Sequence, residues 1–472
     1  MRPNLQRREL LAEFELGLCA RYASAWDPPR TVSAASAPVV LSYATSPPPR
    51  RWLLGLTAAL RGWPIALAGQ GYAGFNYKTL SVTKVFGLRR ALQILHRLRP
   101  ASLVLLADMS DTVLLGGYSP HDGSIATAAA WQAHERIVRA AGSDSASVDT
   151  VAANAECASF PKCFDHLYVA ASAQLPQVRM CHLASKPTCY ANSGAFLGRT
   201  GAMLATFDAM VRMHTRWERA LAEALAQHTT HVVVRNSSRA SHRLPNTLHG
   251  VTIAPGLTGD VGKTERHDDQ ALFSLLYLAQ RHENVSIALD VDGDAFVSTH
   301  ECKGWPPKGN LTLRRKMMGP FAICHRRPWT PLSRLVAPQP TEAATPLLRG
   351  IRYRSIDGVV RSPLLLHSNG QPKRGIPFTH GRKPKEAREL LYAVEKAIKD
   401  ALGEGQGEGD KASTSLMDHA VLLLDPAAGA HRPCAMTSLR KLLHSPPRNQ
   451  SVNVSWPAWA QRESSFPHGP VL

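Results

Sequence analysis

The sequence predicts an α/β fold in which a mostly parallel sheet is flanked by helices. Segments typical of buried strands alternate along the chain with segments whose apolar residues recur at helical spacing. Several of the strand-like runs also end abruptly in polar residues, at the edge where open α/β sheets bind their ligands. With 472 residues, of which 44% are hydrophobic, the chain is long enough for one large domain with appendages.

The first elements follow a β-α-β order. Residues 39–45 predict a buried strand, residues 51–61 a helix and residues 64–67 a second strand. A helix is expected over 84–98, because its apolar residues recur every three to four positions. This helix leads into an apolar strand that begins at Leu103.

The alternation continues through the middle of the chain. Further strands are expected at 150–155, 190–197 and 285–289. Further helices are expected at 125–141, 202–227 and 270–282. Two stretches rich in polar residues or proline, 231–265 and 328–346, are typical of surface excursions.

Composition predicts three regions. We expect an N-terminal extension over residues 1–35 and a main domain over residues 36–375. Residues 376–472 are expected to form a basic, partly disordered C-terminal extension, because a Gly/Glu/Asp-rich linker and a proline-rich end follow one charged amphipathic helix at 384–402.

The chain is strongly basic, with a net charge of +19 from 55 Lys and Arg against 36 Asp and Glu. This balance favours anionic partners such as nucleic acid, a membrane surface or sugar nucleotides. The basic residues are scattered in pairs, and no zinc-finger spacing or aromatic RNA-binding signature accompanies them. We therefore expect no specific nucleic-acid binding.

Glycosylation motifs favour the lumen of the secretory pathway, in the endoplasmic reticulum or Golgi. Five sequons of the form Asn-x-Ser/Thr begin at Asn236, Asn284, Asn310, Asn449 and Asn453. The eight cysteines lack the CxxC spacing of zinc sites, and some of them would pair in that compartment. The N-terminal residues make a poor signal peptide, and no apolar run approaches the ~20 residues of a membrane span.

Two carboxylates, Asp108 and Asp111, end the apolar run that starts at Leu103. Nearby carboxylates at the end of a buried strand are costly unless a cation neutralises them, and such a cation can also hold a diphosphate. Capping of a following turn by Asp108 explains the segment equally well.

A polar step interrupts the predicted strand at 190–197, where Asn192, Ser193 and Gly194 follow one another. Glycine permits close approach of a ligand, and the asparagine amide can both donate to and accept from sugar hydroxyls. A strand bulge is the alternative.

Asp268 and Asp269 open the helix predicted at 270–282. Capping explains one of them. The pair could also hold a sugar donor or accept a proton from an acceptor hydroxyl. The segment by itself favours capping and catalysis equally.

A fourth apolar run, 364–366, ends in His367 and continues through Asn369 and Gly370 to Lys373. Neutral imidazole can ligate a transition metal, and a lysine can meet phosphate. A lone histidine after a strand is more often structural, which is the alternative here.

In this order the segments resemble the glycosyltransferase domain of the procollagen lysyl hydroxylase family and, more distantly, the collagen galactosyltransferases. The resemblance covers roughly residues 39–373 and rests on LADMSDTV at 106–113, AEC and FP within 155–161, NSGAFLG at 192–198, DDQ at 268–270 with Tyr277, and HSNG at 367–370. The hydroxylase half of that family is expected to be absent, since no iron-binding HxD motif with a distal histidine follows residue 373.

The resemblance implies a GT-A-type nucleotide-sugar-binding fold that works with Mn²⁺ and UDP-glucose or UDP-galactose. Asp108, Asp111 and His367 match the metal ligands of that family, and Asp268 and Asp269 match its catalytic acidic cluster. The residues that would bind the nucleotide sugar are Tyr43, Thr45, Lys84, Asn192, Ser193, Gly194, Asn369, Gly370 and Lys373.

The resemblance also implies an enzyme that transfers glucose or galactose to a hydroxyl of a protein or glycan acceptor. Three departures stand against a complete match. Met109-Ser110 replaces the usual aromatic residue between the two acids, Phe160 replaces a tryptophan, and the acidic cluster before Gln270 is shorter than in the family. A catalytically silent sugar-nucleotide-binding or scaffolding protein is therefore the alternative.

Overall fold

A computed structural model gives the structure of the protein. It describes residues 19, 38–44, 52–60, 62–70, 82–109, 111–115, 123–142, 149–157, 167–168, 171, 175–178, 188–227, 247–248, 251–252, 268–298, 334–336, 352–355, 357–367, 417–424 and 434–444.

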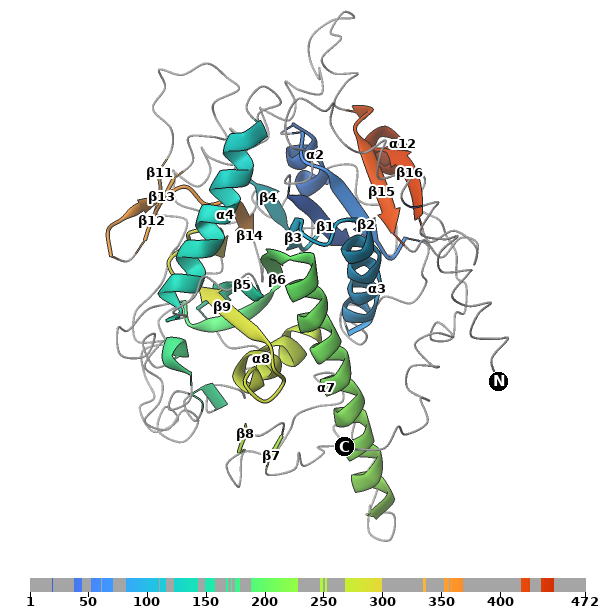
Figure 1. The fold of residues 1–472 in the computed structure, drawn as a ribbon, viewed down its shortest axis with the longest axis vertical. Coiled ribbons are helices and arrows are strands. Elements are labelled where there is room, and N and C mark those ends of the chain that lie inside the picture. Colours follow the sequence, from blue (N-terminus) through green and yellow to red (C-terminus); the bar gives the residue numbers. More distant parts are fainter. Residues whose placement is uncertain are drawn as a thin grey trace, which may run out of the picture.

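An eight-stranded sheet forms the centre of the molecule (Figure 1), in the order β16-β15-β2-β1-β3-β6-β5-β9. Its strands are β1 (Val39–Tyr43), β2 (Ile65–Ala68), β3 (Leu103–Ala107), β5 (Thr150–Glu156), β6 (Tyr190–Arg199), β9 (Ser286–Asp290), β15 (Ala420–Leu424) and β16 (Cys434–Ser438). Neighbours pair in parallel except at β15-β16 and on both sides of β6. The predicted α/β class with a mostly parallel sheet is confirmed.

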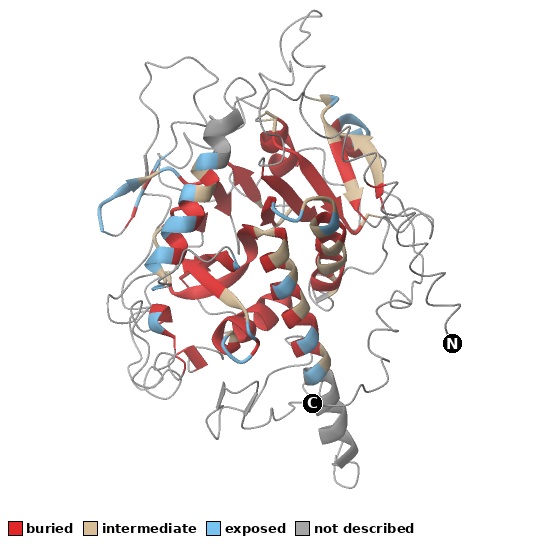
Figure 2. Cartoon of the chain, viewed as in Figure 1, coloured by how far each residue is buried: buried red, intermediate tan, exposed pale blue. Residues whose placement is uncertain are grey.

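Helices cover both faces of this sheet. They are α2 (Leu53–Leu60), α3 (Val82–Leu98), α4 (Gly123–Ala140), α7 (Thr200–Gln227), α8 (Asp269–Ala279) and α12 (Leu439–His444). In β3, Val104 and Leu106 join the apolar cluster of α3, α7 and α8, whereas Leu103 and Leu105 join that of α2, α4 and α12. Alternate strand residues therefore build two cores, and α4 turns a buried side inward and an exposed side outward (Figure 2).

A small second sheet pairs the strand that follows β3 with segments far along the chain. It contains β4 (Thr112–Leu114), β14 (Leu365–His367) and β10 (Phe296–Ser298) in the order β10-β14-β4. The antiparallel pairing of β4 and β14 sets His367 opposite Thr112. The described residues also include the short strands β7 (Thr247–Leu248), β8 (Val251–Thr252), β11 (Leu335–Val336), β12 (Arg352–Arg354) and β13 (Val360–Arg361).

Every strand and helix predicted between residues 39 and 289 is present, with ends that differ by a few residues. The strand at 364–366 is confirmed as β14. Strand β10 and the hairpin of β12 and β13 were not expected from the sequence. The helix predicted at 384–402 lies outside the described residues.

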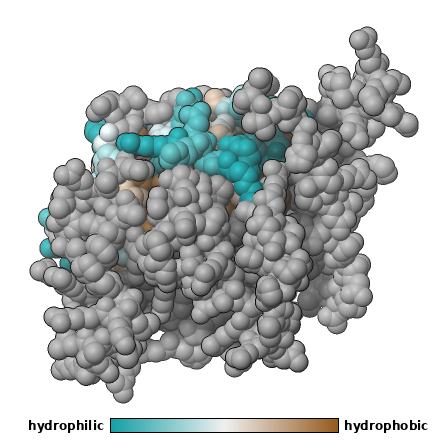
Figure 3. Space-filling view, turned by 90° about the horizontal axis from the view of Figure 1, so that it is seen from below, coloured by the Kyte–Doolittle hydropathy of each residue, from teal (hydrophilic) through white to brown (hydrophobic). Residues whose placement is uncertain are grey.

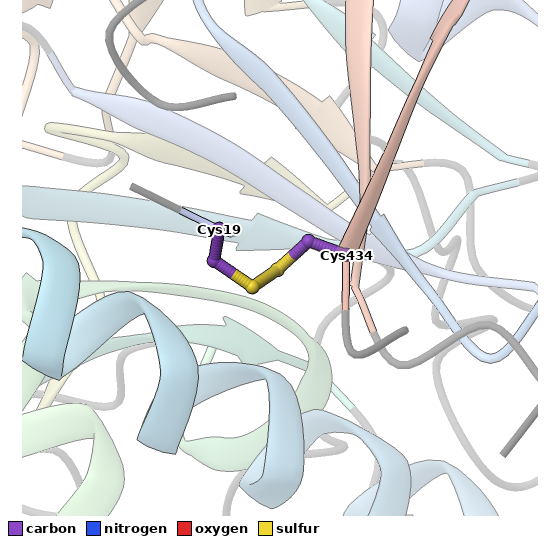
Figure 4. The surroundings of a disulfide bond; sticks show 2 residues. All are labelled: Cys19 and Cys434. Carbon is purple, nitrogen blue, oxygen red and sulfur yellow. A yellow bond between two sulfur atoms is a disulfide. The ribbon is translucent and has the colours of Figure 1, made fainter. Parts of the chain in front are cut away.

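The C-terminal part of the chain contributes to the central sheet, although residues 376–472 were expected to be an extension. Strand β15 pairs in parallel with β2, and its side chains Leu422 and Leu424 are fully buried. A disulfide joins Cys19 to Cys434 at the start of β16 (Figure 4), so both predicted extensions contribute to the same core. Burial of apolar strand residues at an open sheet edge is the physical reason.

The surface is mainly polar where the structure describes it. On the face drawn in Figure 3, hydrophilic side chains prevail among the described residues. The exposed large hydrophobic side chains among them are Val359 and Val360, next to each other in the β12-β13 hairpin. None of the helices in this part of the chain is long and apolar enough to cross a membrane.

Candidate metal site and its acidic surroundings

Three side chains that can ligate a metal meet between the two sheets. Asp108 follows β3, Asp111 precedes β4, and His367 ends β14. One ligand atom from each residue lies within 4.8 Å of the others. His367 Nε2 is 3.7 Å from both Asp108 Oδ2 and Asp111 Oδ1. The structure thus brings together the three residues predicted as metal ligands, although His367 lies more than 250 positions after the two aspartates in the chain.

Backbone pairing fixes the turn that carries the two carboxylates. The Asp108 N–H donates to the carbonyl of Gly194 on β6, at 2.8 Å. The Thr112 hydroxyl donates to the carbonyl of Asp108 and closes the turn from inside. Since Thr112 also faces His367 across β4 and β14, one local structure sets both acids beside the imidazole.

The imidazole of His367 lies in a tight, buried space with only 1% of the residue exposed. A Cβ added to Gly194 would lie 2.0 Å from His367 Cε1, so only glycine at that position leaves room for the ring. His367 Nδ1 lies 3.0 Å from Asn154 Nδ2. Nε2 is buried and has no hydrogen-bond partner among the described residues.

These residues fit a divalent metal ion. Buried polar atoms are nearly always paired in folded proteins, so a buried ring nitrogen that faces two carboxylates needs an explanation. A ligated cation supplies one, since it would bind Nε2 and offset the repulsion between Asp108 and Asp111. Two carboxylates and one imidazole suit ions such as Mn²⁺, which accept both oxygen and nitrogen ligands.

Lys84, predicted to contact the ligand, connects the metal candidates to the second acidic pair. From α3, its Nζ lies 2.5 Å from Asp108 Oδ1 and 3.0 Å from Asp269 Oδ2, and it donates to the Ser193 carbonyl at 3.3 Å. Burial lowers the pKa of Lys84, but the two carboxylates raise it more, so its pKa lies above the usual value and the ammonium stays charged.

Asp268 and Asp269, predicted as catalytic acids, have different roles in the structure. Asp268 caps α8, since its Oδ1 accepts the N–H of Ala271 at 3.0 Å. Burial and the neighbouring Asp269 raise the pKa of Asp268 to about 7. Asp269 makes different contacts from the capping residue. Its Oδ2 accepts from the Lys84 ammonium and from the Ser193 hydroxyl, each at 3.0 Å. The capping alternative therefore holds for Asp268, and Asp269 lies nearer the metal candidates.

The polar step in β6 is both an irregularity and part of the site. Between β5 and β6 the register shifts, so that residues 192–195 lie opposite the single residue Asn154. Asn192 Oδ1 accepts the Gly194 N–H at 2.8 Å and an N–H of Asn154 at 3.1 Å. The bulge predicted as the alternative is present, and it is what places Gly194 under the imidazole.

Tyr43 lies at the end of β1, beside β3 in the sheet. Its ring fills a gap next to two glycines: a Cβ at Gly69 or Gly87 would lie 2.4 or 2.3 Å from the Tyr43 ring. The remaining predicted nucleotide-sugar residues, Thr45, Asn369, Gly370 and Lys373, lie outside the described residues.

Two buried residues of this site were not predicted as site residues. Asn154 contacts His367 and Asn192. Gln270 accepts the Ser193 N–H at 2.6 Å and donates to Glu156 at 3.3 Å. The signal for Asn154 was a single polar residue within the small apolar run 151–155, a pattern that by itself also fits a structural asparagine.

No family model matches this chain, and no curated protein matches it. The inference of function therefore depends on the fold, the site and the motifs in the sequence.

Proposed function

We propose that the protein is a metal-dependent glycosyltransferase of GT-A type that transfers glucose or galactose from a UDP-sugar to a hydroxyl of a protein or glycan. The observation that carries the proposal is the buried, unpaired Nε2 of His367 facing Asp108 and Asp111. The motif order shared with the procollagen lysyl hydroxylase glycosyltransferase domain supports the same reaction.

The charge of the site supports a requirement for a metal. Among the described residues, Asp108, Asp111 and Asp269 contribute three carboxylates, and Lys84 is the cation bound to two of them. A diphosphate would meet net repulsion here. Mn²⁺ held by Asp108, Asp111 and His367 would offset that negative charge and supply the Lewis acid that stabilises charge on the departing UDP.

The chain's own residues hold the site in place for this chemistry. Lys84 fixes Oδ1 of Asp108, which leaves Oδ2 directed toward His367 and Asp111. The same ammonium holds Asp269, whose second neighbour is the Ser193 hydroxyl. In the proposed reaction Asp268 or Asp269 positions the donor sugar or the acceptor hydroxyl.

The lumen of the endoplasmic reticulum or Golgi is the proposed location. The four described cysteines, Cys19, Cys157, Cys189 and Cys434, are all disulfide-bonded. Disulfides persist in oxidising compartments. The sequon residue Asn284 is exposed at a turn, with a φ of 52°. These features support passage through the secretory pathway.

One contact favours the alternative, a catalytically silent sugar-nucleotide-binding or scaffolding protein. The Lys84 ammonium already neutralises one oxygen of Asp108, and an ion pair of this kind stabilises the acids without a metal. Mn²⁺-dependent UDP binding without transfer to any acceptor would favour this alternative.

Hydrolysis of UDP-glucose and UDP-galactose, measured with and without Mn²⁺, tests the proposal. We expect metal-dependent turnover that Asp111→Ala abolishes. Asp418→Ala is the matched control, because Asp418 is exposed and pairs with Arg440 far along the chain from the site. Undiminished turnover in Asp111→Ala would contradict the metal assignment, and absence of turnover in the unmodified protein would contradict the enzyme assignment.

A further inference from the structure

We infer that Asn154 is a positioning residue for His367: its side-chain amide orients the imidazole and determines whether Nε2 can bind a metal. The inference rests on the proposed metal site and concerns a residue outside the predicted ligand set. Two buried atoms without a hydrogen-bond partner carry the inference, one on Asn154 and one on His367. A contact between other atoms of the two side chains connects these residues.

Asn154 is fully buried in β5, at the point where the β5–β6 register shifts. Its Nδ2 lies 3.1 Å from Asn192 Oδ1 and 3.0 Å from His367 Nδ1. An amide nitrogen has two hydrogens, so it can donate to both acceptors at once. Asn154 thus contacts the His367 ring at Nδ1, on the side away from Nε2, and is itself hydrogen-bonded to Asn192 on β6.

The contact leaves one polar atom unpaired on each side. Asn154 Oδ1 and His367 Nε2 are both buried and have no hydrogen-bond partner within the described parts of the chain. Each unpaired atom belongs to a group that can exist in two orientations or two proton arrangements. The amide can turn by half a rotation, and the neutral imidazole can carry its proton on either nitrogen.

In the present orientation the amide N–H donates to Nδ1, so the proton of a neutral ring resides on Nε2. A protonated Nε2 has no lone pair for a metal. If the amide turns, Oδ1 faces Nδ1 and accepts an N–H from it, and the Nε2 lone pair then faces Asp108 and Asp111. Metal-bound histidines commonly donate their other N–H to an oxygen in this way.

The change conserves protons and has an identifiable cost. One proton leaves Nε2 for solvent and one is taken up at Nδ1, so the charge of the ring does not change. The turned amide brings Asn154 Oδ1 toward Asn192 Oδ1, which opposes the rotation in the metal-free protein. Asn192 Oδ1 still accepts the Gly194 N–H at 2.8 Å, so it keeps a partner in either state.

Two substitutions separate this role from simple packing. Asn154→Leu keeps the branch at Cγ and removes both hydrogen-bonding groups, so we expect Mn²⁺ affinity to fall roughly 10- to 100-fold by calorimetry. Asn154→Asp keeps only acceptors, which favour Nδ1–H, so we expect it to bind Mn²⁺ within a few-fold of the unmodified protein. Thr150→Val, at the opposite end of β5, is the control and should leave the affinity unchanged.

A spectroscopic measurement reports directly which nitrogen of the His367 ring carries the proton. Nitrogen-15 shifts of the His367 imidazole should report Nε2–H in the metal-free protein and Nδ1–H in Asn154→Asp or after addition of Mg²⁺, a diamagnetic probe. Unchanged Mn²⁺ affinity in Asn154→Leu, or equal losses in the Leu and Asp variants when both fold, would overturn the inference. If the unmodified protein binds neither Mn²⁺ nor Mg²⁺, the proposed metal site itself fails together with this inference.

Discussion

Aspartates lie at the ends of two strands of the central sheet, β3 and β9, and the two ends differ in how their carboxylates are satisfied. Asp290, the last residue of β9, is buried, and its two oxygens accept four backbone N–H groups, those of Gly293, Asp294, Ala295 and Phe296. Asp294 in turn pairs with Arg136 and Arg361. After β3, Asp108 and Asp111 converge on the unpaired Nε2 of His367.

A cluster of acids is a metal candidate only where backbone donors or basic side chains do not already satisfy its carboxylates. The sequence 290–294, with aspartates at alternate positions, resembles a cation loop more than 108–111 does. The carboxylate of Asp290 nevertheless accepts backbone N–H groups, and that of Asp294 pairs with arginines, so both acids already have partners and the loop is structural. The β3 end has one lysine, two converging acids and an imidazole whose Nε2 has no hydrogen-bond partner among the described residues.

The largest expected effect is loss of metal binding in Asp111→Asn. The substitution removes one charged ligand, so we expect Mn²⁺ affinity to fall by about 100-fold or more. The metal-free protein should unfold at the same or a higher temperature, because repulsion from Asp108 decreases. Calorimetric titration and thermal unfolding measure the two effects. Mn²⁺ binding that survives this change would remove the distinction between the two strand ends.

Asp290→Ala should have the opposite profile. Removal of the carboxylate leaves four backbone N–H groups without their acceptor, and we expect the free energy of unfolding to decrease by about 2–4 kcal/mol. Denaturant unfolding measures this loss. Mn²⁺ affinity of the folded fraction should change little, and a selective loss of metal binding with normal stability would show that the β9 loop takes part in the site.

Gly194→Ala tests the packing that aims the imidazole. The new Cβ would overlap His367 Cε1, so the ring must shift and we expect Mn²⁺ affinity to decrease by about 10-fold, with about 1–3 kcal/mol lost in stability. Gly198→Ala is the matched control on β6, because its Cβ would lie 3.3 Å from Val151 Cγ2. Equal metal affinity in both variants would mean that Gly194 does not position His367.

The smallest expected effect concerns the pH dependence of stability at Asp268. Its pKa of about 7 in the folded state exceeds the usual aspartate pKa of 3.8. The folded state therefore holds a proton that the unfolded state releases, and stability decreases as pH rises from about 4 to about 7. Asp268→Asn keeps a good helix cap and should remove part of this decrease, on the order of 1 kcal/mol.

Unfolding measured at several pH values between 4 and 8 tests this prediction. The difference in stability between Asp268→Asn and the unmodified protein should grow in favour of the variant as pH rises. A constant difference across this range would show that Asp268 titrates normally. Asp357→Asn is a useful comparison, because Arg361 and Ser355 hold the pKa of Asp357 below its usual value even though burial opposes this.

The sequence predicted those parts of the site that depend on where strands end. Apolar runs alone placed Asp108 after one strand and His367 at the end of another, and the structure brings both together with Asp111. The sequence could not distinguish Asp268 from Asp269, because the helix cap and the contact with Lys84 depend on how α8 packs against α3 and β6. Asn154 was not predicted as a site residue for the same reason, since its partners come from β6 and β14.

The order of strands and helices, the α/β class and the polar strand ends are encoded locally, in hydrophobic periodicity and turn residues, and could be predicted from the sequence. Three outcomes depend on long-range packing: β15 and β16 complete the sheet, Cys19 pairs with Cys434, and Asp290 is satisfied while His367 Nε2 is not. Those outcomes depend on which distant segments share a sheet edge or a core, and on which backbone donors reach each carboxylate.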